Sequence, residues 1–222
     1  MDVNEQIKEI KKQFRLFMNG VVSQSMREKG LEYKLNFGIE FPRLKEIAAK
    51  FEQNHDVAQA LWKENIRECK ILASLLQPVG TFYPEIADIW VEDMRYPEIA
   101  ELTCMNLFQH LPYASEKAFQ WMADEGEYYQ FCGYMLMARL LMKGCELSEP
   151  SENEFIDQSM TAIQGESGIV CRAASTALGK YACQRVENAR KLLKMIRPLA
   201  NSDRMEVVAL VEEVKFEAES LH

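Results

Sequence analysis

The sequence has few of the residue patterns that mark a metal site, a disulfide framework or a nucleophilic catalytic centre. It contains three histidines, one of them the C-terminal residue, and none stands at ligand spacing from another histidine or a cysteine. The six cysteines form no C-x-x-C pair and lie within apolar helical patterns, so we interpret them as buried thiols. A glycine loop of the phosphate-binding type is also absent. The sequence therefore predicts neither a bound metal nor another cofactor.

Long apolar runs and strand signals are equally scarce. No apolar run approaches the roughly 20 residues that a membrane-spanning helix needs, and the polar segment MDVNEQIKEIKK is unlike a secretory signal. With 48% hydrophobic residues and a mean hydropathy of -0.26, the composition is ordinary for a soluble globular protein. We expect a cytoplasmic protein that does not bind membranes.

Basic residues are fewer than acidic ones, which gives the chain a net charge of -8. Because non-specific affinity for DNA comes mostly from Lys and Arg that neutralise phosphates, extensive coating of DNA is disfavoured. The distribution is uneven, however: acidic residues dominate from Glu85 to Asp157, whereas basic residues outnumber acidic ones from Arg172 to Arg204. A basic C-terminal region beside an acidic middle can still bind nucleic acid on one face.

Apolar residues recur at three- and four-residue steps along most of the chain, which predicts helices. The segment Tyr33–Leu76 predicts a loop followed by three short helices, with Pro42 at the first helical turn. The loop around Phe37-Gly38-Ile39 is apolar, so we expect it to be packed against the helices. Residues 127–142 are apolar almost all round and predict the most central helix.

Helices of this length bury too little surface alone, so each must pack against its neighbours. Their pairing suggests units of roughly 35–45 residues, the size of a HEAT-type repeat. The sequence therefore predicts an all-α, HEAT-like helical-repeat solenoid, an α-α superhelix that forms a single domain over residues 1–222. The predicted repeats start near Pro42, Pro84, Ser115, Ser151 and Val186.

Three runs in the N-terminal half carry a family resemblance: F-G-I-E-F-P-R-L-K-E-I-A, then A-L-W, then R-E-C-K-I-L-A-S-L-L. Together they resemble the N-terminal signature of the alkylpurine DNA glycosylase family of DNA alkylation repair proteins, which are built from HEAT-like repeats. The resemblance implies a basic concave face that binds alkylated duplex DNA, and hydrolysis of the N-glycosidic bond of N-alkylpurines. It implies no metal and no covalent lysine; a carboxylate stabilises the cationic sugar, and aromatic side chains touch the lesion.

The family's catalytic motif, W-W-D-x-x-D, falls on Tyr96-Pro97-Glu98-Ile99-Ala100-Glu101. Both acids are present as glutamates and both tryptophans are replaced. Glu101, which matches the second acid, is the candidate catalytic carboxylate, with Glu98 beside it. The extra methylene of glutamate moves the charge, and such misplacement can lower a rate about a hundredfold. Alternatively, both glutamates are first-turn acids that stabilise the helix dipole.

Two further family positions differ: an arginine is replaced by Cys132, and a tryptophan falls near Thr176. Helical phase favours core packing over base contact for Trp62, Trp90 and Trp121. Arg139 can replace the missing arginine, or it can be a buried arginine paired with an acid. The basic candidates can contact phosphate or can belong to a solvated helix face. The candidate DNA-binding residues are Arg139, Arg172, Lys180, Arg185 and Tyr129.

Two functions remain open on this sequence. The first is a DNA alkylation repair protein that binds duplex DNA, with or without retained glycosylase activity. The second is a catalytically inactive HEAT-repeat scaffold that binds a protein partner, which the acidic middle and the pI near 5.1 favour.

Overall fold

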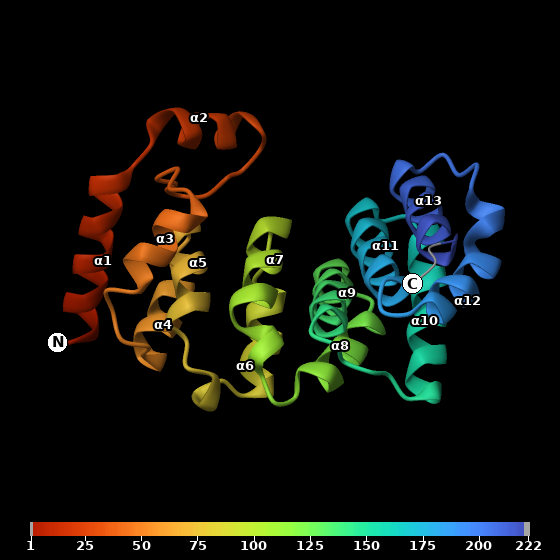
Figure 1. Cartoon of the computed structure of the whole chain (residues 1–222). Helices are drawn as coiled ribbons and strands as arrows, with labels where there is room; N and C mark the ends of the chain where they lie inside the picture. Colours follow the sequence, from red (N-terminus) through yellow and green to blue (C-terminus); the bar gives the residue numbers. More distant parts are fainter. Residues whose placement is uncertain (1, 220–222) are drawn as a thin grey trace. The chain divides into compact units, whose positions relative to one another are not determined.

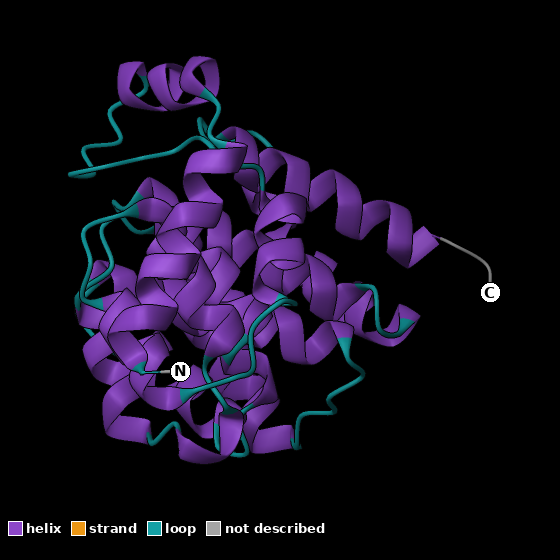
Figure 2. Ribbon diagram, turned by 90° about the vertical axis from the view of Figure 1, so that its left-hand side faces the viewer, coloured by secondary structure: helices purple, strands orange, loops and turns teal. Residues whose placement is uncertain are grey.

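The computed structural model describes residues 2–219, which fold entirely as helices and connecting loops, with no strand among them (Figure 2). Figure 1 shows the order of the helices along the chain. The α-helices are α1 (Val3–Phe17), α2 (Gly20–Glu28), α3 (Phe41–Ala48), α4 (His55–Trp62), α5 (Arg67–Leu76), α6 (Pro84–Glu92), α7 (Pro97–Asn106), α8 (Ala114–Met122), α9 (Glu127–Met142), α10 (Glu149–Gln164), α11 (Gly168–Ala182), α12 (Val186–Ile196) and α13 (Met205–Glu219).

Local signals in the sequence set many of the helix ends. Pro84 and Pro97 are the first residues of α6 and α7, where the missing N–H costs no helical hydrogen bond. Asn54 caps α4, since its side chain accepts a hydrogen bond from the Val57 N–H at 3.0 Å. Gly30 follows α2 with a φ of +88°, a left-handed conformation that glycine adopts without steric cost.

The described helices fall into two compact units, residues 1–111 and 112–222. In the first unit, α4 packs on α5, and α5 lies between α3 and α7 (Figure 1). Trp62 and Trp90 stack in its core, with ring centroids 4.0 Å apart and nearly parallel planes. Phe82 contacts Trp90 edge-on, at 4.8 Å. The predicted core positions of the three tryptophans are confirmed, because each is at most 4% exposed.

The second unit consists of three helix pairs arranged in two layers. Helices α8, α10 and α12 pair with α9, α11 and α13, respectively, and α11 contacts both α9 and α13 (Figure 1). We call α8, α10 and α12 the outer layer, and α9, α11 and α13 the inner layer. Gly133 allows the close approach of α9 to α8, because a Cβ at this position would lie 2.6 Å from the backbone nitrogen of Met122.

The predicted helices and packed loop are confirmed. The observed starts of α3, α6, α8, α10 and α12 lie within two residues of the predicted repeat starts, and Phe37 and Ile39 are 8% and 1% exposed. The single domain over 1–222 stays a prediction. The prediction of six buried thiols was wrong for Cys145, which is half-buried, and for Cys183, which is exposed because it follows α11 on its open side. None of the described helices is long and apolar enough to span a membrane.

Candidate nucleic-acid interface

A buried carboxylate holds the packed loop before α3. The side chain of Glu68, which is 0% exposed, accepts hydrogen bonds from the backbone N–H groups of Phe37 at 3.1 Å and Ile39 at 3.3 Å. Asn36 closes the loop on itself by accepting the Gly38 N–H at 2.8 Å. These contacts satisfy backbone groups that would otherwise be buried without a partner.

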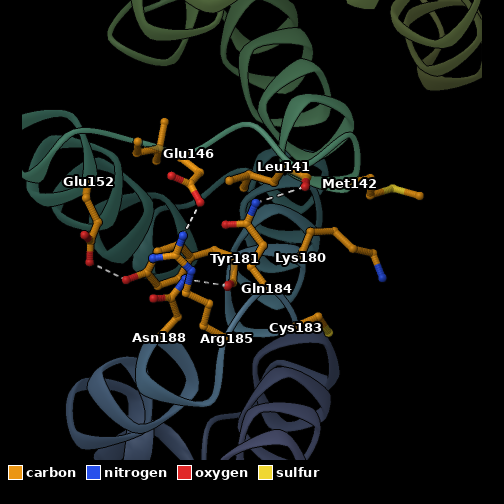
Figure 3. A pocket seen from close by; sticks show the side chains of 12 residues that line it. Leu141, Met142, Glu146, Glu152, Lys180, Tyr181, Cys183, Gln184, Arg185 and Asn188 are labelled. Atoms are coloured by element: carbon orange, nitrogen blue, oxygen red, sulfur yellow. Dashed lines mark hydrogen bonds and ion pairs between the residues drawn. The ribbon is translucent and has the colours of Figure 1, made fainter.

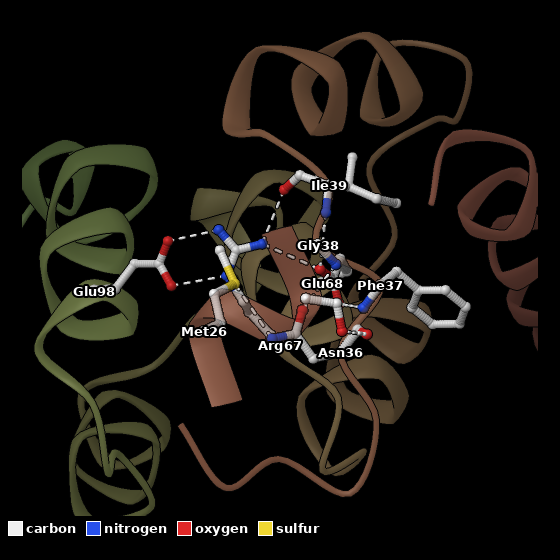
Figure 4. A network of polar contacts seen from close by, with 9 residues as sticks. Met26, Asn36, Phe37, Gly38, Ile39, Arg67, Glu68 and Glu98 are labelled. Atoms are coloured by element: carbon white, nitrogen blue, oxygen red, sulfur yellow. Dashed lines mark hydrogen bonds and ion pairs between the residues drawn. The ribbon is translucent and has the colours of Figure 1, made fainter. Parts of the chain in front are cut away.

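Arg67 connects this loop to α7 (Figure 4). Its guanidinium donates to the carbonyl of Ile39 at 2.9 Å and to Glu68 at 3.1 Å. On its other side it forms a bidentate ion pair with Glu98, with distances of 2.8 and 2.6 Å. Arg67 is only 2% exposed, so its charge depends on these carboxylates for compensation. The structure thus places Glu98, the weaker catalytic candidate, in a structural ion pair.

Glu101 lies one turn further along α7 and makes no hydrogen bond or ion pair with any residue of the described range 2–219. It is half-buried, and Leu102 and Met105 beside it are also partly exposed. The two candidate carboxylates therefore differ: Glu98 is bound by Arg67, whereas Glu101 remains available for a ligand.

The exposed side of α11 carries a narrow stripe of residues at four-residue steps. Arg172 and Thr176 are exposed, and Lys180 is half-buried. Ala173 and Gly179, which flank the stripe on the helix surface, are buried against neighbouring helices. Thr176 stands where the family resemblance places a tryptophan, between the two cations. The stripe therefore faces away from the protein interior.

A third cation, Arg139, extends this surface on α9. It is half-buried, and the residues that the structure describes give it no ion pair, so the alternative of a buried arginine paired with an acid was wrong. Met142, one turn further on, lines the same cavity as Lys180, so the exposed sides of α9 and α11 adjoin. We call Arg139, Arg172 and Lys180 the inner-layer cations; none has a carboxylate partner within residues 2–219.

Arg185 differs from the inner-layer cations because an acid neutralises it (Figure 3). It precedes α12 and forms an ion pair with Glu146 at the rim of a polar cavity of about 450 Å³. Gln184 holds the same region together by donating to the carbonyls of Leu141 and Cys145, both at 3.0 Å. In Figure 3 the Lys180 side chain extends away from the Arg185–Glu146 pair. Arg185 is therefore a weaker phosphate candidate than Lys180.

Tyr129 is not aligned with the inner-layer cations. A helix turns about 100° per residue, so Tyr128, eleven residues before Arg139, lies on the side of Arg139, whereas Tyr129 is displaced by about 80°. Tyr128 and Tyr129 are both half-buried, and Tyr128 contacts Phe131 edge-on at 6.4 Å. The helical phase favours Tyr128 over Tyr129 as the aromatic neighbour of Arg139.

Acids of α13 border the stripe at its C-terminal end. Burial, Glu217 and Glu213 raise the pKa of the Cys183 thiol, and Lys180 partly opposes them. This acidic border is not visible in the sequence, because the phase of α13 relative to α11 depends on packing. The spacing of Arg172, Thr176 and Lys180 was the available signal for the stripe itself.

A family model described as "DNA alkylation repair enzyme" matches residues 5–161. The chain belongs to this family. The match includes Glu98, Glu101, Tyr129 and Arg139, and ends before Arg172. The family resemblance of the N-terminal motifs is therefore confirmed.

One solved structure supports the fold of the DNA alkylation repair family across the chain. It is described as "a new family of proteins related to the HEAT-like repeat DNA glycosylases with affinity for branched DNA structures". The TM-score is 0.79 at 15% identity, and the match covers 98% of this chain and 94% of the other. The predicted all-α, HEAT-like repeat fold is thereby confirmed. A search of curated proteins found no match.

Proposed function

We propose that this protein binds duplex DNA through the exposed side of α9 and α11. The observation that carries the proposal is the set of inner-layer cations, Arg139, Arg172 and Lys180, which lack carboxylate partners within residues 2–219 of an acidic chain. Membership of a DNA repair family supports it, and so does the likeness to a protein described as having affinity for branched DNA. Branched as well as alkylated duplexes are therefore the substrates to test.

The expected affinity is modest and depends strongly on salt. Each neutralised phosphate contributes about -0.9 to the slope of log binding constant against log salt concentration. Three phosphate contacts therefore give a slope near -2.7. The net charge of -8 repels DNA elsewhere on the surface. Because phosphate contacts carry no sequence information, selectivity would come from the shape of the DNA.

Fluorescence anisotropy with a labelled duplex and a labelled four-way junction, measured over a salt series, tests this proposal. Arg172→Ala with Lys180→Ala should weaken binding about tenfold or more and lower the salt slope by about 2. Lys194→Ala with Arg197→Ala is the matched control, because these exposed cations lie on α12 and just after it, in the outer layer.

Equal losses for the two pairs of substitutions would show that the inner-layer cations have no special role. Absence of binding at low salt would remove the DNA proposal. It would instead favour the second function considered for this sequence, a scaffold that binds a protein partner.

Glu101 supports a second candidate function, the excision of N-alkylpurines. Its carboxylate has no partner among residues 2–219, and a carboxylate near a developing oxocarbenium ion lowers the barrier electrostatically. Incubation with N-methylpurine DNA should release the free base, and Glu101→Gln should abolish the release. Release by the wild-type protein no faster than spontaneous loss would exclude an excision role.

A further inference from the structure

A cavity of about 270 Å³ lies in the first unit, whereas the inner-layer cations belong to the second. Three connections meet there: the loop between α2 and α3, the turn between α4 and α5, and the turn between α6 and α7. The volume is just below the range of about 300–1,000 Å³ that is usual for small-molecule sites, so a compact ligand fits. The lining residues are Tyr33, Lys63, Asn65, Lys70, Asp93, Met94, Arg95, Tyr96 and Ile99.

The cavity carries an excess of positive charge in a chain that is acidic overall. Lys70 is neutralised by an ion pair with Asp93 and also donates to the carbonyl of Trp62 at 3.0 Å. Lys63 and Arg95 are exposed and have no acidic partner within residues 2–219. Arg95 donates only to backbone carbonyls, at 2.8 and 3.0 Å. Two cations at the cavity are therefore free to bind an anionic group.

The same cavity has an aromatic wall. The rings of Tyr33 and Tyr96 lie 4.7 Å apart, and the Tyr96 hydroxyl accepts the Glu32 N–H at 2.7 Å. The Tyr33 hydroxyl is buried and has no hydrogen-bond partner among residues 2–219, which is costly for a polar group. Burial raises the pKa of Tyr33. Asn65, whose side-chain amide forms no hydrogen bond within residues 2–219, adds a donor and an acceptor.

We propose that this cavity binds a single nucleotide unit, with its base against Tyr33 and Tyr96 and its phosphate on Lys63 and Arg95. Aromatic faces for a base and free cations for a phosphate are the two features that unpaired nucleic acid requires. The nucleotide can come from an unpaired strand of a branched DNA or from free nucleotide in solution. Binding of an unpaired strand rests on the proposed DNA binding, whereas binding of free nucleotide does not.

The test compares a blunt duplex with the same duplex carrying a 5′-phosphorylated single-stranded flap, by anisotropy. The wild-type protein should bind the flapped DNA about tenfold tighter, since stacking of even one base contributes a factor of this order. Lys63→Ala with Arg95→Ala should remove that preference and leave the affinity for the blunt duplex unchanged. Arg27→Ala with Lys34→Ala is the control, because both residues are exposed in the same unit and do not line the cavity.

Tyr33→Leu provides a second variant, which removes the aromatic ring and keeps an apolar side chain. Loss of the ring should weaken binding of the flapped DNA about tenfold, because stacking of one base contributes a factor of this order. Unchanged flap affinity in Tyr33→Leu would contradict the assigned place of the base, whatever the behaviour of the cation variants.

Titration with a deoxynucleoside monophosphate, followed by ¹H–¹⁵N NMR, separates the two sources. Saturable shifts at the cavity that Lys63→Ala with Arg95→Ala abolishes would support the site through free nucleotide, even if no DNA binds and the proposed function fails. A flap preference without such shifts would support a strand end as the source. The proposal is wrong if neither is seen, or if the cation variants weaken blunt and flapped DNA equally.

Discussion

Two groups of cations differ in whether carboxylates of the protein neutralise them. One group is Arg67 and Lys70 of α5 in the first unit, and the other is the inner-layer cations of the second unit. Arg67 and Lys70 are 2% and 9% exposed, and carboxylates accept their hydrogen bonds. Arg172 and Lys180 are more exposed and have no acidic partner within residues 2–219. A charge that the fold has already compensated is structural, whereas an uncompensated one on an open helix face is available to a ligand.

The largest expected effect is that of Arg67→Met. It leaves Glu68 buried without its cation and should lower the free energy of unfolding by about 3–5 kcal/mol. Urea denaturation followed by circular dichroism measures this. Arg43→Met is the matched control: its ion pair with Glu46 is exposed, so the change should cost only about 0–1 kcal/mol. Similar losses for both variants would show that burial does not distinguish the two arginines.

Glu98 and Glu101 allow a finer comparison on one helix. Glu98→Gln weakens the bidentate contact with Arg67, and because the carboxylate side chain is 36% exposed we expect a loss of about 1 kcal/mol. Glu101→Gln should change stability by less than about 0.5 kcal/mol, as is usual for a side chain without specific contacts. A larger loss for Glu101→Gln than for Glu98→Gln, in the same urea experiment, would reverse the roles assigned to the two acids.

Arg172→Ala with Lys180→Ala should leave stability within about 0.5 kcal/mol of the wild type, since neither side chain has an ion-pair or hydrogen-bond partner in the described part of the chain. Thermal unfolding monitored by circular dichroism checks this. The result matters for the DNA experiment, because a loss of affinity in a fully stable variant cannot be attributed to unfolding. A marked drop in Tm would show instead that these two cations stabilise the fold.

The last prediction depends on pH and concerns Glu152 in the second unit, whose ion pair with Lys191 is more exposed than the pair of Arg67 with Glu68. Hydrogen bonds from Lys191 and Tyr181 lower the pKa of Glu152 below its unfolded value. Its contribution is therefore present at pH values above the unfolded pKa and is lost as the pH falls through the folded pKa. Glu152→Gln should reduce stability by about 0.5–1 kcal/mol at pH 7 and by less at pH 3. Urea denaturation at both pH values measures this. Equal losses of stability at pH 7 and pH 3 would show that the charge of Glu152 does not contribute to stability.

Much of the fold could be predicted from the sequence because its signals are local. Prolines start α6 and α7, Gly30 follows α2, and the apolar character of 127–142 marks the helix α9. These features depend on residues within one or two turns of each other, which the order of the chain already brings together.

The candidate site was only partly predictable. The spacing of Arg172 and Lys180 was visible in the sequence, but the ion pair that neutralises Arg185 joins residues 39 apart in the chain. Likewise, the helix-opening motif favoured Glu101 over Glu98 as the catalytic carboxylate, but it gave no sign that Arg67, 31 residues earlier, binds Glu98.

The sequence by itself determined the helices, their ends, the apolar loop before α3 and the family, because each follows from residues near one another in the chain or from short motifs. Only the packing of the helices decided which charged side chains form ion pairs and which remain accessible to a ligand. Pairing of Arg67 with Glu98, and of Tyr33 with Tyr96, requires helices and loops distant in sequence to meet in space. No local sequence pattern predicts these two long-range contacts, because they result from how the apolar faces of several helices are buried together.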